Sequence, residues 1–273
     1  MTSNEDRADG GGVAEDEQPD EELDEAFERL VAQGRERLGR PLRELVATGL
    51  LGGIDVGVGI LAYFVVKHET GSQLLASLAF TVGFVALLLA HSELFTENFL
   101  VPVTTVVADK GPWLGLLRLW AVTLVTNVAG GSVAIWVILL ARPDLHEVAR
   151  ETGEHYAELG VNVRSFMLAV LGGLVITLMT RAQNSTDSLG VKIVPAILFS
   201  AVLVGAELFH AVLDQIFIIG AVLVGSDITL GQFMTALVWA GLGNMVGGIG
   251  FVTFLRLLRT APKIEAEREK SPA

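Results

Sequence analysis

The chain has 273 residues, of which 51% are hydrophobic, and a formal net charge of -12. Its charges gather near the two ends and in short segments between long apolar stretches, which excludes an ordinary soluble domain. It contains no cysteine, which excludes disulfides, thiolate metal sites and cysteine nucleophiles.

The chain begins with an acidic segment. Residues 1–19 are rich in Asp and Glu and poor in apolar residues, which predicts a disordered tail. Over residues 20–44 apolar residues recur at helical spacing, which predicts an amphipathic helix at the cytoplasmic surface. Two interpretations stay open: this helix only leads into the membrane, or it gates a pore above it.

Six apolar segments follow, and each is long enough to cross roughly 30 Å of hydrocarbon. The second and the fifth are too long for one straight crossing and have polar residues in the middle, which predicts a broken helix in each. Together the spans form a predicted transmembrane channel domain over residues 45–260. The predicted spans are 45–66, 74–108, 114–140, 165–181, 193–224 and 231–258.

The segments between these spans alternate in basic character, which is the usual signal for orientation. Lys and Arg dominate before the first span, after the even-numbered spans and in the C-terminal tail at 261–273. We therefore expect both termini to lie in the cytoplasm, with the protein in a bacterial inner membrane.

Three short motifs occur twice in the same order. Gly52-Gly53 matches Gly172-Gly173, and Glu93-Leu94-Phe95 matches Glu207-Leu208-Phe209. A glycine pair begins three positions after each of Asn127 and Asn244. These matches predict duplication of a three-span unit, and an odd number of spans forces the two copies into opposite orientations. The expected fold is therefore an all-α membrane protein with two inverted repeats and an aquaporin-like architecture. Two helix interruptions facing each other near the midplane favour a path for a small anionic or polar solute.

At these motifs the chain resembles the formate/nitrite transporter family. The similarity covers about residues 45–258 and is strongest at Glu93-Leu94-Phe95-Thr96 and at His210, although Phe-Thr-Glu-Asn at 95–98 marks a divergent branch. The resemblance implies a homopentamer with a pore through each subunit, which conducts small monovalent anions such as formate, nitrite or acetate.

The resemblance also implies roles for individual residues. His210 would be the central pore histidine and would accept or donate a hydrogen bond with Thr96, while Lys192 would be a basic residue near the pore. Leu94 and Phe95 would form one hydrophobic constriction, and Phe84, Ile176 and Leu203 the other. Asn127 and Asn244 would pack helices together.

Protonation of the substrate anion would allow it to cross the apolar constrictions as a neutral acid. An anion loses more hydration free energy than its neutral acid when it enters an apolar constriction. A histidine with an ordinary pKa of about 6.5 is suited to relay the proton. We therefore expect substrate protonation at His210, with protons and a small anion as the partners.

Five acidic residues in spans or interruptions oppose an anion path: Asp55, Glu93, Glu97, Glu207 and Asp214. One interpretation is that most are protonated or bonded to backbone amides. Another is a cation or divalent-metal pathway, in which the acids act together with His91 and His210. A third function is a non-transporting membrane scaffold. The sequence indicates no enzyme, no cofactor, no resident metal and no nucleic-acid partner.

Overall fold

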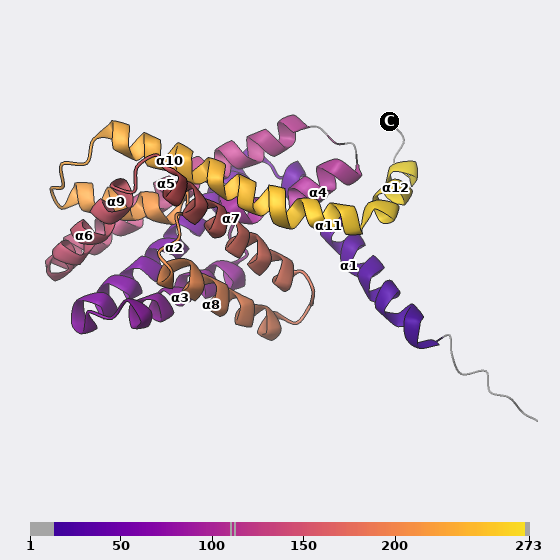
Figure 1. Cartoon of the computed structure of the whole chain (residues 1–273), viewed down its shortest axis with the longest axis horizontal. Coiled ribbons are helices and arrows are strands. Elements are labelled where there is room, and N and C mark those ends of the chain that lie inside the picture. The colour runs from indigo at the N-terminus through magenta and orange to yellow at the C-terminus, as the bar shows by residue number, and fades with distance from the viewer. Residues whose placement is uncertain (1–13, 110, 112, 271–273) are drawn as a thin grey trace, which may run out of the picture.

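The computed structural model describes residues 14–109, 111 and 113–270, and those residues form helices joined by short connections (Figure 1). The first part of the chain forms α1 (Ala14–Gly39), α2 (Leu42–Thr70), α3 (Gln73–Ala90), η1 (Phe95–Phe99), α4 (Val101–Ala108), α5 (Trp113–Ala141) and η2 (Pro143–Leu145). The second part forms α6 (His146–Ala157), α7 (Val163–Gln183), α8 (Leu189–Gly205), α9 (Leu213–Leu223), α10 (Leu230–Met245), η3 (Val246–Thr253), α11 (Phe254–Arg259) and α12 (Ala261–Lys270).

Five of the described helices are long and apolar enough to cross a membrane: α2, α3, α5, α7 and the continuous helix from α10 to α11. Three shorter apolar segments complete the set, at Phe95–Ala108, Leu189–Gly205 and Leu213–Leu223. The chain is therefore a multi-pass membrane protein. Each predicted span corresponds to helix, and the two predicted to be interrupted are divided, one between α3 and α4 and the other between α8 and α9.

We call residues 91–100, between α3 and α4, the first break, and residues 206–212, between α8 and α9, the second break. Each has a non-glycine residue in the left-handed region, His91 at φ 54° as the first residue of the first break and Glu207 at φ 49° as the second residue of the second break. This conformation costs free energy for a residue with a Cβ, so packing around the breaks must hold it in place.

Two asparagines hold the breaks against the neighbouring helices. The Asn127 amide donates to the carbonyls of Gly49 (2.8 Å) and Glu93 (2.7 Å), and its oxygen accepts from the Phe95 amide (2.8 Å). The N–H and C=O groups of a break have no helical partner, and lipid offers none at membrane depth. These bonds give the Phe95 amide and the Glu93 carbonyl a partner and so stabilise the irregular backbone.

The second asparagine repeats this arrangement. Asn244 donates to the carbonyls of Ala169 (2.7 Å) and Phe209 (2.9 Å) and accepts from the Ala211 amide (2.9 Å). Each asparagine lies against a glycine pair, because a Cβ on Gly53 or Gly173 would overlap the asparagine carbonyl oxygen. The packing roles predicted for Asn127 and Asn244 agree with these contacts.

One predicted correspondence is wrong. The two asparagines bond to Glu93 and Phe95 in the first break but to Phe209 and Ala211 in the second. The two Glu-Leu-Phe sequences are therefore displaced by two positions in the structure, and His210 occupies the place of Leu94.

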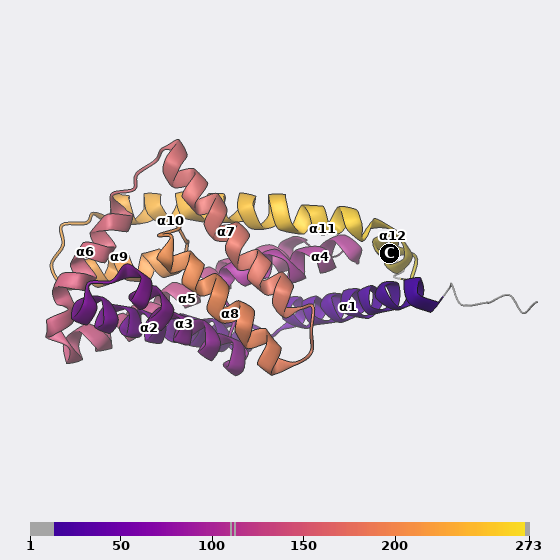
Figure 2. The same ribbon diagram turned by 60° about the horizontal axis from the view of Figure 1, so that its bottom comes forward.

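The helices at the two ends of the chain lie at the same end of the molecule (Figure 2). Helix α1 buries Phe27 and Val31 in a cluster with Ala108 and Ile264, so it packs on both α4 and α12. The Arg35 guanidinium bonds to Asp109 (2.7 Å) and Glu267 (2.7 Å), and these carboxylates raise the pKa of Arg35.

Helix α1 occupies most of the segment for which an amphipathic helix is predicted. It begins at Ala14 and so includes the last residues of the predicted tail, while residues 1–13 lie outside the described residues. It ends at Gly39 because Pro41 has no amide hydrogen and disfavours helical backbone in the residue before it.

Candidate functional site

The two breaks meet at one side-chain hydrogen bond. Thr96 Oγ1 of the first break lies 2.9 Å from His210 Nε2 of the second, and both residues are fully buried. The hydrogen bond that the family resemblance implies between these residues is therefore present.

Backbone amides determine which nitrogen of His210 carries the hydrogen. The amides of Val212 and Leu213 point at Nδ1, at 3.3 and 3.2 Å. Because both amides are donors, Nδ1 is an acceptor, and the neutral ring carries its hydrogen on Nε2. Nε2 therefore donates to Thr96 Oγ1, and the hydroxyl hydrogen of Thr96 is left to donate elsewhere.

The buried carboxylates near the breaks have different partners. Asp214 accepts a hydrogen bond from the His210 backbone amide. This contact agrees with the interpretation that acids in the spans are bonded to backbone amides. Glu93, which is only 2% exposed, is instead paired with the Arg40 guanidinium at 2.7 Å. The Asn98 amide lies 3.4 Å from the other Glu93 oxygen. Glu93 is therefore neutralised by an arginine of the connection after helix α1 rather than by the break itself.

A second arginine, Arg37 of α1, reaches the same break. Arg37 donates to the Asn98 side chain at 3.0 Å, and its Nε lies 3.9 Å from Glu93. From the sequence, Arg37 and Arg40 are two of the basic residues before the first span, which predict only its orientation. Their spacing of three residues places both on one face of the helix predicted over residues 20–44, and this is the signal that pairs them.

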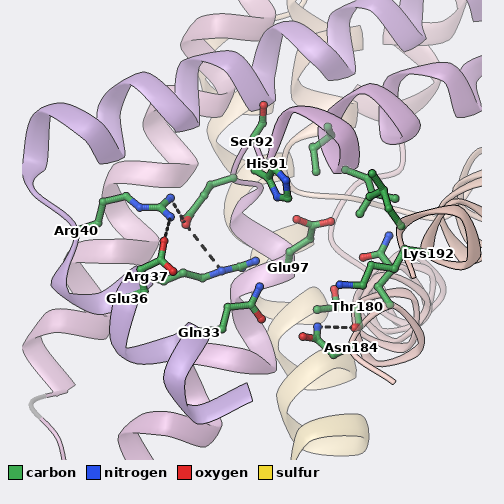
Figure 3. Close-up of a pocket in the computed structure, with 15 residues that line it drawn as sticks. Gln33, Glu36, Arg37, Arg40, His91, Ser92, Glu97, Thr180, Asn184 and Lys192 are labelled. Carbon is green, nitrogen blue, oxygen red and sulfur yellow. Dashed lines mark hydrogen bonds and ion pairs between the residues drawn. The ribbon is translucent and has the colours of Figure 1, made fainter. Parts of the chain in front are cut away.

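A cavity of about 250 Å³ opens between α1, the first break and the facing ends of α7 and α8 (Figure 3). Two predicted site residues, Glu93 and Lys192, contribute to its wall. The other charged or titratable residues of the wall are Glu36, Arg37, Arg40, His91 and Glu97. The cavity therefore combines cations from two helices with acids from the breaks and α1.

The predicted constriction residues lie together in the largest apolar cluster. Leu94, Phe95, Phe84, Ile176 and Leu203 are each at most 4% exposed and belong to that cluster. This placement satisfies the apolar requirement of a constriction, and their role in narrowing a path stays a prediction.

Glu207, a predicted pore residue, does not line the cavity. It is exposed at the start of the second break and is absent from the cavity wall. Within residues 14–109, 111 and 113–270, no group of three or more His, Asp or Glu side chains is placed to hold a metal ion. Among these residues, the acids and histidines of the two breaks therefore form no common cluster of metal ligands.

Comparison with known proteins gives consistent matches. A family profile described as formate/nitrite transporter matches residues 24–258. Inner membrane protein YfdC of Escherichia coli is 27% identical over 73% of this chain and 66% of its own length. Formate channel BtFdhC of Bacillus thuringiensis is 26% identical over 83% of this chain and 91% of its own length.

A solved structure shares the fold. A pentameric formate channel with formate bound is 22% identical in sequence, with a TM-score of 0.67. The match covers 81% of this chain and 98% of that channel. The fold of nearly a whole channel subunit is therefore present here.

Proposed function

We propose that this chain, which belongs to the formate/nitrite transporter family, is a channel for small monovalent weak-acid anions such as formate. A relative is named a formate channel, and the similar structure holds formate. The observation that carries the proposal is the buried Thr96–His210 hydrogen bond, because it joins the two breaks and leaves a hydroxyl hydrogen available for a solute.

The proposed architecture has six spans in two inverted three-helix units, assembled as a homopentamer with both termini in the cytoplasm. The matching bonds of Asn127 and Asn244 support the duplication. The shared position of α1 and α12 supports a common side for the termini. The similarity to a pentameric channel supports the assembly.

In the proposed path, cations capture the anion and apolar residues select its neutral form. Arg37, Arg40 and Lys192 attract an anion into the cavity. Passage between Leu94, Phe95 and the second constriction then costs less for the neutral acid than for the anion, because a buried charge loses its hydration.

His210 is the proposed place of proton exchange, with Thr96 as its contact. The Nε2 hydrogen cannot leave a neutral ring without producing an imidazolate, so His210 passes a proton on only when Nδ1 gains one. Protonation of Nδ1 displaces the amide bonds of Val212 and Leu213, which is the cost of the step.

Formate flux in liposomes tests the proposal. Wild-type protein should carry formate faster at about pH 5 than at about pH 8, because histidine and weak acids take up protons in this interval. His210→Asn should lower the flux and change its pH dependence, whereas His68→Asn, at the exposed end of α2, should leave both unchanged. Absence of formate, nitrite and acetate flux from wild-type protein at every pH would overturn the proposal.

A further inference from the structure

Two charged side chains of the cavity wall differ from the others. Glu93 and Glu36 are both paired with Arg40, and Arg37 is bonded to Asn98. Among the described residues, neither Glu97 nor Lys192 has an ion pair or side-chain hydrogen bond. An acid and a base thus share one cavity without neutralising each other.

Glu97 stands where the cavity adjoins the breaks. The residue is 6% exposed, and its carboxyl group extends into the cavity (Figure 3). It directly follows Thr96, whose hydroxyl contacts His210. A group at this position can reach a solute in the cavity before that solute reaches the constriction.

The charged groups that face Glu97 come from four segments. Helix α1 contributes Glu36 and Arg37, the connection after it contributes Arg40, the first break contributes His91 and Glu93, and α8 contributes Lys192. Helix α7 adds only the uncharged Thr180, Gln183 and Asn184 to the wall. The described residues of α5, α10 and η3, which also pack near η1, add no charged residue to it.

The charge balance of the cavity depends on the proton of Glu97. With Glu97 protonated and His91 neutral, the three cations Arg37, Arg40 and Lys192 face the two carboxylates Glu36 and Glu93. One positive charge is then left, which a single monoanion neutralises. With Glu97 ionised, the charges of the wall already cancel, and the attraction for an anion is lost.

We propose that Glu97 and Lys192 form a binding site for a monocarboxylate, in which Glu97 gives its proton to the bound anion. This inference rests on the proposed anion channel, and it assigns the donation of the proton to Glu97 in place of His210. The O–H bond of Glu97 breaks and an O–H bond forms on a carboxylate oxygen of the solute. The neutral acid then moves toward Thr96 and His210, and hydronium from the solution outside the cavity returns a proton to the Glu97 carboxylate and leaves water.

With Glu97 as the donor, His210 does not lose the hydrogen bonds that its Nδ1 accepts from the Val212 and Leu213 amides. A proton delivered at Glu97 leaves the ring in its neutral form, with the amide bonds to Nδ1 intact. His210 and Thr96 then hold an already neutral solute by hydrogen bonding.

The test measures formate flux and proton movement together in liposomes that contain a pH-sensitive dye. Glu97→Gln keeps the shape and removes the proton, and we expect formate flux at about pH 7 to fall on the order of 100-fold, as for loss of a general acid. Glu97→Asp should keep proton movement coupled to formate. Glu44→Gln, an exposed acid paired with Arg40 outside the cavity wall, should stay within about twofold of wild type.

A measurement on wild-type protein covers the case in which Glu97→Gln does not fold. A carbodiimide reacts with protonated carboxyl groups, so it should label Glu97 near neutral pH, and formate should protect against the label. Absence of labelling at Glu97 overturns the inference, as does coupled proton movement in Glu97→Gln equal to that of wild type. Wild-type protein that carries no formate overturns the proposed function instead.

Discussion

Replacing Arg40 with glutamine should destabilise the protein through Glu93. The Glu93 carboxylate is 2% exposed and loses its 2.7 Å partner in this variant. Removing one partner of a buried ion pair costs about 3–5 kcal/mol. Arg37 and Asn98 stay near Glu93, so we expect the lower end, about 3 kcal/mol.

Unfolding by sodium dodecyl sulfate in mixed micelles measures these free energies. Arg40→Gln combined with Glu93→Gln should recover most of the loss, because no buried charge is left unpaired. Arg43→Gln, an exposed position on α2, is the matched control and should change stability by less than about 0.5 kcal/mol. Equal stability of Arg40→Gln and wild type, or a double variant no better than Arg40→Gln, would refute the reasoning.

Three further variants test the packing. Gly173→Ala should cost about 1–3 kcal/mol, because its Cβ overlaps the Asn244 backbone, whereas Gly190→Ala meets no atom within 4 Å and should leave the thermal midpoint unchanged. Asn244→Leu leaves the Phe209 carbonyl and the Ala211 amide of the second break without this partner, at about 1–3 kcal/mol each, so little monodisperse protein should be recovered. Arg35→Gln should speed tryptic cleavage of α1 without changing the thermal midpoint, because its side chain is 47% exposed and such pairs contribute at most about 1 kcal/mol.

Hydrophobic length and polar interruption were sufficient to predict the helices of the six spans and the division of two of them, whereas α6 and α12 were not predicted. These signals are local, because each depends only on the composition of one segment. The register of the breaks was not predictable in the same way. The repeated Glu-Leu-Phe sequence suggested one alignment, whereas the bonds of Asn127 and Asn244 give another, displaced by two residues. Hydrogen bonds between distant segments determine that register.

The cavity was only partly predictable. Lys192 was identified from the family resemblance and Glu93 from the interruption of its span, and both line the cavity. Arg37 and Arg40 were not, because their role depends on α1 folding back beneath the first break, and Pro41 alone does not indicate the direction of that turn. Glu97 was seen as an acid that opposed an anion path. Among the described residues it forms no ion pair with a cation of the wall, and this arrangement, which makes it a proposed proton donor, is visible only in three dimensions.

The asparagine contacts also show how the site depends on the two halves of the chain. Asn127 bonds only to α2 and the first break, and Asn244 only to α7 and the second break, so each half holds its own irregular backbone. The Thr96–His210 bond, by contrast, crosses between the halves, as does the bond from Thr253 to the Phe99 carbonyl. Under the proposed duplication, a single ancestral half already contained a stabilised break, whereas the hydrogen bond between the threonine and the histidine required two such halves that faced each other.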